Sequence, residues 1–387
     1  MDFDSVLIYL IVFIISLAAT YIAEKLFADK RRREVAYLIG ILFSIFAILL
    51  PCFLAQMRDV SVGTDIKGYV LPNYNIARNC KSFTLFYSVE YSKVELLFSV
   101  LIYIGAKIGN IGVTFFLIEF LTIFPIYYVL YKRREKASMT MGMLLFYFLF
   151  YNFSFSGMRQ SIAMSFMLLS FYMITNDRKL KSLIYAIIAA LFHSSAILII
   201  PIYILISYIY KSPAKKRKKF YAIIIIVLCI LFFNYERIAW LLQRIVGFVS
   251  GRYAFYVANY LNVYSGIVWE NIHATDLLCK FIIILFAMLV FKISNKNDAE
   301  AYYMIFMLLI GRYFVIFNAV FYESLRFAYY FDYFLIIFIP CIFKCVKKNY
   351  LNKIIVMVGI MIPSLLYWFY YIMFIGGYGT NQYIMRK

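Results

Sequence analysis

Separated arginines, two histidines and a few acidic residues are the side chains of this chain that could do chemistry. Arg58, Arg159 and Arg326 stand far apart in the sequence, each in a short link or at the end of an apolar segment. A guanidinium stays charged and its planar fork matches phosphate oxygens, so three of them on one face could surround a diphosphate. Each also has a simpler interpretation, as a helix cap, a residue reaching the lipid headgroups or an ion-pair partner.

His193 and Asp65 are the side chains suited to proton transfer. The ordinary pKa of histidine lies near neutrality, so a neutral imidazole could remove the proton from an attacking hydroxyl. Asp65 follows Gly63 and Thr64 in a turn, where it could be the base itself or a partner that orients His193. Either residue could instead be structural, as a hydrogen-bonded turn histidine or a solvated carboxylate. His273 lies in a longer polar loop and ranks below His193.

The sequence shows no pattern of a metal site or a disulfide framework. Its cysteines lie mostly in apolar runs without CxxC spacing, and there is no dense acidic cluster. We therefore expect no cofactor and a metal-independent reaction. The net charge of +20 could suggest nucleic acid, but Lys and Arg gather in short loops between apolar runs, as in cytoplasmic loops of membrane proteins. No nucleic-acid partner is expected.

The segments that must position these residues are strongly apolar. Of the 387 residues, 65% are hydrophobic and 21% aromatic, which lies far from the composition of soluble domains. The sequence predicts an all-α fold, a polytopic transmembrane helical bundle that forms a single integral-membrane domain over residues 1–387. Since a helix needs about 20 apolar residues per crossing, we expect about 12 membrane segments.

The charges between the apolar runs predict the topology. The first run follows two aspartates and precedes a basic cluster, so we expect a retained helix with its N-terminus outside. Basic residues flank both ends of the run 182–210, which predicts a hairpin that turns at His193, Ser194 and Ser195. The other expected crossings are 5–23, 35–57, 111–131, 139–156, 161–175, 220–233, 277–291, 301–322, 327–343 and 354–375.

This topology places residues 58–93 and 234–276 in two outer loops. Within or beside them, the runs 96–106 and 238–250 are too short to cross, and re-entrant or interfacial helices are expected. Isolated ionisable residues gather on the same face, where they are functional candidates because charges at membrane depth are costly. Besides those named above, they are Asp59, Glu236, Arg237, Arg244, Arg252, Asp276, Arg312, Glu323 and Asp332.

Four groups of short motifs follow one another along the chain. They are Arg58-Asp59 with Gly63-Thr64-Asp65 and Tyr69; Asn152 with Met158-Arg159-Gln160-Ser161-Ile162-Ala163; Lys179 through Ala189 to Phe192-His193-Ser194-Ser195-Ala196; and Arg326-Phe327-Ala328-Tyr329-Tyr330-Phe331. In this order they resemble the EpsG family of Wzy-like polysaccharide polymerases over nearly the whole chain. Residues 234–276 match no pattern of that family.

The resemblance implies a multi-pass protein of the bacterial plasma membrane with an outward-facing active site. Polyprenyl-diphosphate-linked oligosaccharides would be both donor and acceptor, and capsule, O-antigen or exopolysaccharide the product. Membrane lipids are expected partners and a chain-length regulator is a candidate one. The expected site has catalytic His193 and Asp65, diphosphate ligands Arg58, Arg159 and Arg326, and supporting residues Gln160, Glu323 and Tyr330.

Two other functions fit the same features. A glycan ligase would use the same chemistry on a different acceptor. A lipid-linked glycan flippase or another transporter would also be polytopic and cationic, although related halves and a charged central pathway would then be expected, and no internal repeat is evident. The intermediates that accumulate when the gene is deleted would separate these functions. Loss of a polymerase leaves single lipid-linked repeats, whereas loss of a ligase leaves unligated polymer.

Overall fold

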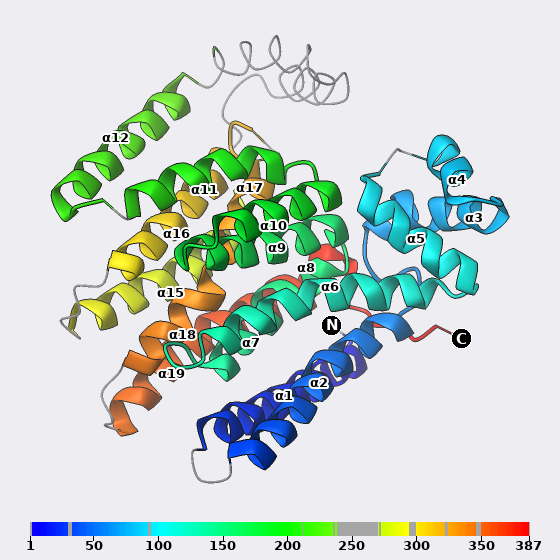
Figure 1. The fold of residues 1–387 in the computed structure, drawn as a ribbon, viewed down its shortest axis with the longest axis horizontal. Helices are drawn as coiled ribbons and strands as arrows, with labels where there is room; N and C mark the ends of the chain where they lie inside the picture. The colour runs from blue at the N-terminus through cyan, green and yellow to red at the C-terminus, as the bar shows by residue number, and fades with distance from the viewer. Residues whose placement is uncertain are drawn as a thin grey trace.

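The computed structural model describes residues 2–29, 33–91, 94–210, 212–234, 237, 270, 272–293, 299–321, 324–345 and 350–386. Within these ranges the regular structure is helical, and strand-like pairing is limited to one isolated bridge between Arg58 and Met385. The predicted all-α fold is therefore confirmed. Figure 1 shows the helices packed side by side, with a group of short helices at one edge.

The N-terminal half contains the longest helices. Helices α1 (Phe3–Ala28) and α2 (Arg33–Met57) lie side by side, and α6 (Ile111–Lys132) packs against α2 and against α9 (Met158–Thr175) (Figure 1). Between α2 and α6 the chain forms the group of short helices. These are η1 (Ile66–Val70), α3 (Leu71–Asn79), α4 (Phe83–Val89) and α5 (Leu96–Ile108).

The remaining helices form the central and C-terminal part of the bundle. They are α7 (Met139–Phe146), η2 (Tyr147–Tyr151), α8 (Asn152–Ser154), α10 (Lys179–Phe192), α11 (Ala196–Tyr210), α12 (Ala214–Phe233), α15 (Ala274–Ile293), α16 (Ala299–Phe317), α17 (Ser324–Asp332), α18 (Leu335–Cys345), α19 (Tyr350–Leu366), η4 (Tyr367–Phe374) and η5 (Gly377–Gly379). The predicted short helix at 238–250 lies outside the described residues.

Seven helices in the described ranges are long and apolar enough to cross a membrane. They span residues 3–28, 34–57, 111–132, 274–291, 300–317, 324–344 and 353–374. The prediction of about 12 crossings is not confirmed. Two expected segments form shorter apolar helices, at 139–154 and 196–205, and the run 96–106, expected to be too short to cross, lies in the short helix 96–108. Helix breaks and polar residues interrupt runs that looked continuous in the sequence.

The break predicted near His193 is present. Helix α10 ends at Phe192 and α11 begins at Ala196. His193 has extended backbone angles, φ −153° and ψ 117°, and its N–H still donates to the carbonyl of Ala189. The residue is therefore fixed at a helix end, with its side chain free to point away from the helix axis.

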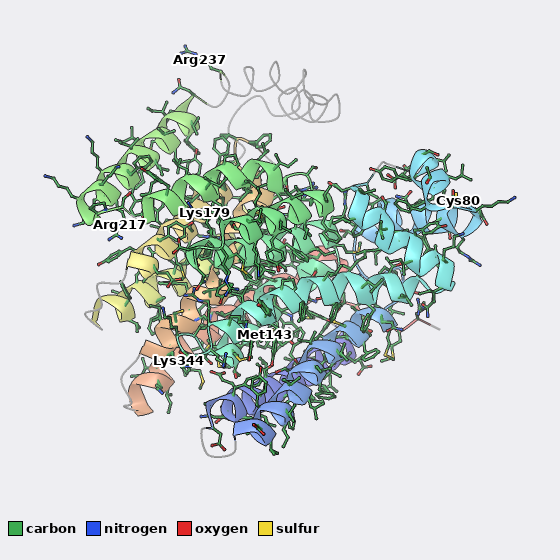
Figure 2. All side chains as sticks on the ribbon, in the orientation of Figure 1. Cys80, Met143, Lys179, Arg217, Arg237 and Lys344 are labelled. Carbon is green, nitrogen blue, oxygen red and sulfur yellow. The ribbon has the colours of Figure 1, made fainter. Side chains whose placement is uncertain are left out.

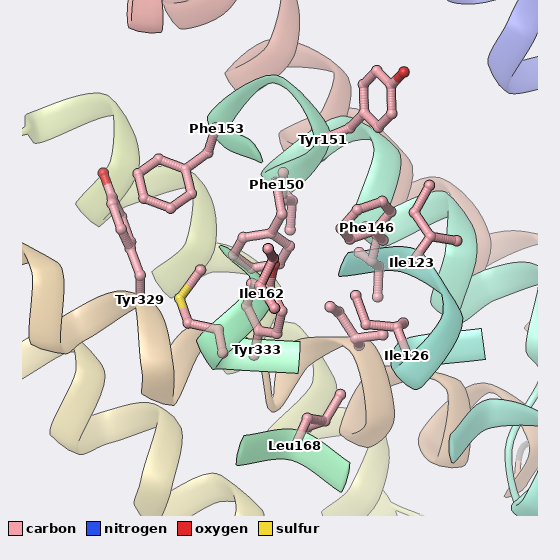
Figure 3. Packing of buried hydrophobic residues seen from close by; sticks show 14 of the residues in the cluster. Ile123, Ile126, Phe146, Phe150, Tyr151, Phe153, Ile162, Leu168, Tyr329 and Tyr333 are labelled. Atoms are coloured by element: carbon pink, nitrogen blue, oxygen red, sulfur yellow. The ribbon is translucent and has the colours of Figure 1, made fainter. Parts of the chain in front are cut away.

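Aromatic packing holds the middle of the bundle together (Figure 3). The rings of Phe153 and Tyr329 lie 4.7 Å apart, and those of Phe150 and Tyr333 lie 4.8 Å apart. Dispersion contacts of this kind drive helix association inside a membrane, where lipid tails are as apolar as the side chains. The first pair joins α8 to α17, and the second joins η2 to the residue that follows α17.

Candidate functional site

A cavity of about 140 Å³ lies where several helix ends meet. Its walls come from η1, the link between α8 and α9, the turn after α10, the first turn of α17 and the C-terminal segment. The lining residues are Asp65, Tyr69, Phe153, Ser156, Gly157, Arg159, Gln160, His193, Arg326 and Tyr378. The structure therefore brings together five residues selected from the sequence, namely Asp65, Arg159, Gln160, His193 and Arg326.

The Gly63–Thr64 turn positions Asp65. Gly63 has φ 111°, and a Cβ at this position would overlap the carbonyl oxygen of Phe155, so only glycine fits. The Gly63 N–H donates to the carbonyl of Gly379 at 3.0 Å, and the Thr64 N–H donates to Ser156 Oγ at 3.2 Å. The turn is thus seated on the α8–α9 link and on the C-terminal segment, with Asp65 at the cavity.

Glu95 connects two of the predicted site residues, although the sequence did not single it out. Its Oε2 accepts a 2.7 Å hydrogen bond from Arg159 Nη1. Its Oε1 accepts hydrogen bonds of 3.0 Å from both the N–H and the hydroxyl of Ser194, and lies 3.3 Å from His193 Nδ1. One carboxylate therefore binds the guanidinium and lies close to the imidazole, whose Nδ1 makes no hydrogen bond in the described part of the chain. Its only local signal was its place directly before the short apolar run 96–106.

The surrounding charges shift the pKa values of this group. Burial alone would raise the pKa of Glu95, but His193, Arg159 and the Ser194 amide hold it well below its usual range. Burial lowers the pKa of His193, and Arg159 also lowers it, while Glu95 opposes both effects. The lowered pKa favours the neutral imidazole. Burial raises the pKa of Asp65, against the opposing effect of the two arginines.

Arg159 and Arg326 present cationic groups to the cavity in different ways. The Arg159 guanidinium lies 4.3 Å above the ring of Tyr69, and its buried Nε has no hydrogen-bond partner in the described part of the chain. Arg326 is exposed, and its carbonyl accepts a 2.6 Å hydrogen bond from Gln160 Nε2. Gln160 therefore holds the backbone of the first turn of α17.

The formal charges at the cavity balance. If His193 is counted as neutral, Arg326 offsets Asp65 in the lining, and Arg159 is offset by Glu95, its ion-pair partner outside the lining. An anion would therefore be held mainly by N–H donors directed at it and less by an excess of positive charge. Among the described residues, no group of three or more His, Cys, Asp or Glu side chains is arranged to hold a metal ion.

Arg58 lies outside the cavity lining, contrary to the predicted diphosphate ligand. Its guanidinium carbon is 3.9 Å from the ring centre of Phe155 and 4.5 Å from that of Phe115, and Nη2 lies 3.6 Å from Met158 Sδ. Burial lowers its pKa to about 10, an effect opposed by Glu119. Because aromatic rings enclose the guanidinium, Arg58 supports the wall behind the α8–α9 link.

The two remaining predicted residues are not placed at the cavity. The Tyr330 hydroxyl lies 3.0 Å from Ser195 Oγ and its carbonyl accepts a hydrogen bond from Tyr203, so Tyr330 braces the turn that carries His193. Glu323 falls outside the described residues. Tyr330 thus supports the site from behind.

The C-terminal segment supplies a wall that the sequence did not indicate. Tyr378 lines the cavity, and its hydroxyl lies 3.0 Å from that of Tyr329 and 3.2 Å from that of Tyr367. Its backbone is left-handed, with φ 64°, which is uncommon for a residue that is not glycine. Asn152 anchors the segment by donating to Thr380 Oγ1 at 3.0 Å. The glycines around Tyr378 were the only local signal.

Four buried charges form a closed network behind this wall. Lys280 Nζ lies 2.5 Å from Asp276 Oδ1 and 2.9 Å from Asp332 Oδ2. Arg312 pairs with the same two carboxylates, at 3.1 Å to Asp276 Oδ2 and in close contact with Asp332 Oδ1. The network joins α15, α16 and α17 without net charge. Asp276, Arg312 and Asp332 were functional candidates in the sequence, and the structure shows them paired with one another and with Lys280.

Comparison with known proteins gives one match. The model of the EpsG family matches residues 41–385, a range that includes the whole cavity lining. No curated protein and no solved structure matches the chain.

Proposed function

The chain belongs to the EpsG family of Wzy-like polysaccharide polymerases, and we propose that it joins lipid-linked oligosaccharide repeat units at the cavity described above. The observation that carries this proposal is the meeting of Arg159, Arg326 and His193 at one cavity, although they come from three distant stretches of the chain. A glycosyl transfer from a diphosphate needs donors for the leaving group and a base for the acceptor, and this set contains both.

The proposed donor is a glycan linked to a polyprenyl diphosphate. Its diphosphate would lie against Arg159 and Arg326, and its polyprenyl chain would run between apolar helices. The proposed acceptor is a hydroxyl of a second lipid-linked glycan. The compact basic loops favour the cytoplasmic side for the other end of the bundle, so the cavity would face outward from a bacterial plasma membrane. The product would be a surface polysaccharide.

The proposed reaction is a single displacement with inversion at the anomeric carbon. The acceptor oxygen forms a bond to that carbon while the bond from carbon to the diphosphate oxygen breaks. The hydroxyl proton passes to His193, and the polyprenyl diphosphate leaves with the bonding electron pair. Charge grows on the leaving group, where the unpartnered Nε of Arg159 and the exposed guanidinium of Arg326 would stabilise it.

Glu95 would set the tautomer of the base. Because its Oε1 faces Nδ1 of His193, that nitrogen would carry the hydrogen and Nε2 would be left as the proton acceptor. A carboxylate that orients an imidazole has this role in other acid–base sites, where it also stabilises the imidazolium that forms. Asp65 remains the alternative base, since it lines the same cavity.

The test compares Arg159→Ala and Arg326→Ala with Arg78→Ala, an exposed arginine of α3, in a strain that lacks the native gene. We expect both cavity variants to accumulate single lipid-linked repeats, with normal protein levels and no polymer, while Arg78→Ala makes polymer. Arg159→Lys is included because it retains a cation next to Glu95 but loses the fork. Normal chain lengths in both cavity variants would refute the proposed diphosphate contacts.

The same strains separate the alternative functions. Loss of a ligase would leave unligated polymer, and loss of a flippase would leave single repeats on the cytoplasmic leaflet. Protection of the repeats from an external glycosidase distinguishes the flippase outcome. Repeats that accumulate on the outer leaflet without polymer are the result expected for a polymerase.

A further inference from the structure

A second and larger cavity, of about 1210 Å³, lies at the other end of the bundle. Helix α2 runs from one cavity to the other. Tyr37 near its first residue lines the second cavity, and its last residue comes just before the turn that carries Asp65 at the first cavity. Helix α19 and its continuation η4 do the same. Lys353 at the start of α19 lines the second cavity, and Tyr378 of the first cavity follows η4. The two cavities are therefore separated by the length of the same helices.

Four basic side chains from separate elements meet at this second cavity. They are Lys25 near the end of α1, Arg134 after α6, Lys344 at the end of α18 and Lys353 in α19 (Figure 2 labels Lys344). These elements border compact basic links of the kind that occur on the cytoplasmic side of membrane proteins.

The acidic residues of the second cavity do not cancel this charge completely. Glu24, Asp29 and Glu135 also line it, so the formal balance favours the four cations by one. Glu24 Oε2 already accepts hydrogen bonds from Ser138 Oγ at 3.1 Å, Thr140 N at 2.9 Å and Thr140 Oγ1 at 2.8 Å. Its charge is thereby partly compensated by donors on α7.

Tyrosines beside the basic residues indicate that this cavity lies at the depth of the lipid headgroups. Lys25 Nζ lies 5.2 Å from the ring centre of Tyr21, and the Arg134 guanidinium lies 4.4 Å from that of Tyr131. The hydroxyls of Tyr131 and Tyr37 are hydrogen-bonded at 2.8 Å. Tyrosines beside lysines and arginines are typical of the headgroup region, where rings contact lipid and charges reach phosphate.

Apolar side chains form another part of the lining. Leu144 of α7, Phe343 of α18 and Met357 of α19 form part of the wall. Helix α1 packs against α2 and α7, and α18 packs against α7, so the cavity occupies the space between the N-terminal pair and α18–α19. A soluble polyanion would leave this apolar wall in water, whereas a phospholipid would cover it with its acyl chains.

We propose that the second cavity binds the headgroup of an anionic glycerophospholipid between the N-terminal helix pair and α18–α19. Its phosphate would lie among Lys25, Arg134, Lys344 and Lys353, and its acyl chains would cover Leu144, Phe343 and Met357. Basic pockets between membrane helices recognise anionic headgroups through the same combination. The bound lipid joins the N-terminal helix pair to α18, both of which pack against α7, so it stabilises the folded bundle.

The test uses the full-length protein, purified in a neutral detergent, stripped of lipid and titrated with phosphatidylglycerol. Native mass spectrometry counts the retained lipid, and the unfolding midpoint reports stabilisation. Lys344→Gln/Lys353→Gln is compared with Lys218→Gln/Lys219→Gln, which removes two exposed lysines of α12. A basic residue near anionic lipid contributes about 1 kcal/mol, or about fivefold in affinity, so we expect about 25-fold weaker binding in the cavity variant only.

Two further ligands define what would overturn the proposal. Phosphatidylethanolamine has no net charge and should stabilise the protein at least tenfold less effectively than phosphatidylglycerol. Inorganic pyrophosphate provides the same phosphate chemistry without acyl chains. Equal stabilisation by either ligand, or equal affinity of the two double variants for phosphatidylglycerol, would refute an anionic-lipid site. Because Lys344 Nζ also donates to the Arg134 carbonyl, Lys353→Gln alone serves as the variant that preserves this bond.

Discussion

Glu95 Oε1 lies 3.3 Å from Nδ1 of His193, and the other oxygen of the same carboxylate accepts a 2.7 Å hydrogen bond from Arg159. The proposed base and one proposed diphosphate ligand therefore both contact one side chain, which also accepts two hydrogen bonds from Ser194. Moving either partner would disturb the other. This shared contact makes Glu95 the most informative position for testing the proposed chemistry.

Replacing Glu95 with Gln should reduce polymerisation strongly. The amide keeps the size of the side chain but cannot pair with the Arg159 guanidinium as an anion or stabilise an imidazolium. Orienting and proton-transfer effects of this kind contribute about 10²- to 10⁴-fold, and we expect a loss of turnover within that range. Turnover of lipid-linked repeats by the purified protein measures it. Glu34→Gln, at an exposed acid of α2, is the control and should retain full activity.

The pH profile should show the titration of His193. A neutral imidazole is required for proton removal, so turnover should fall as the pH drops through the pKa of His193, which burial places below its usual value. Because Glu95 raises that pKa, Glu95→Gln should shift the falling limb further toward low pH. If turnover is abolished in Asp65→Asn and the limb keeps its position in Glu95→Gln, Asp65 is the base.

Local patterns were sufficient to predict the helical class and the break at His193. Apolar runs and the turn at 193–195 are signals that need no knowledge of distant contacts. The match of Asp65, Arg159 and Arg326 to one cavity followed from motif order and topology. The number of crossings was less predictable, because an apolar run does not show whether a helix continues through it.

The features of the site that the sequence did not predict depend on contacts between distant segments of the chain. Glu95 and Ser194 are 99 residues apart, and nothing local marks their hydrogen bonds. Arg58 and Arg159 had equivalent signals in the sequence, yet rings of Phe115 and Phe155 enclose only the first. Whether an arginine faces a cavity or an aromatic shell is decided by packing, which the residue type does not reveal.

Gly63→Ala should destabilise the turn that carries Asp65. The residue has φ 111°, and a Cβ would overlap the Phe155 carbonyl, so both backbone strain and a steric clash oppose the substitution. We expect a loss of at least about 2 kcal/mol in unfolding free energy. Gly68→Ala is a matched control five residues further on, since a Cβ there meets nothing within 4 Å. Equal unfolding midpoints for both variants would contradict this account.

Lys280→Met should be among the most destabilising substitutions in the chain. It leaves Asp276 and Asp332 with Arg312 as their only cation in the network, and breaking a buried charge pair costs about 3 to 5 kcal/mol. Adding Asp332→Asn restores charge balance, so the double variant should recover part of the loss in unfolding midpoint, measured in the same detergent. Lys215→Met, at an exposed lysine of α12, provides the baseline. A double variant less stable than Lys280→Met would mean that hydrogen-bond geometry, more than charge balance, holds α15, α16 and α17 together.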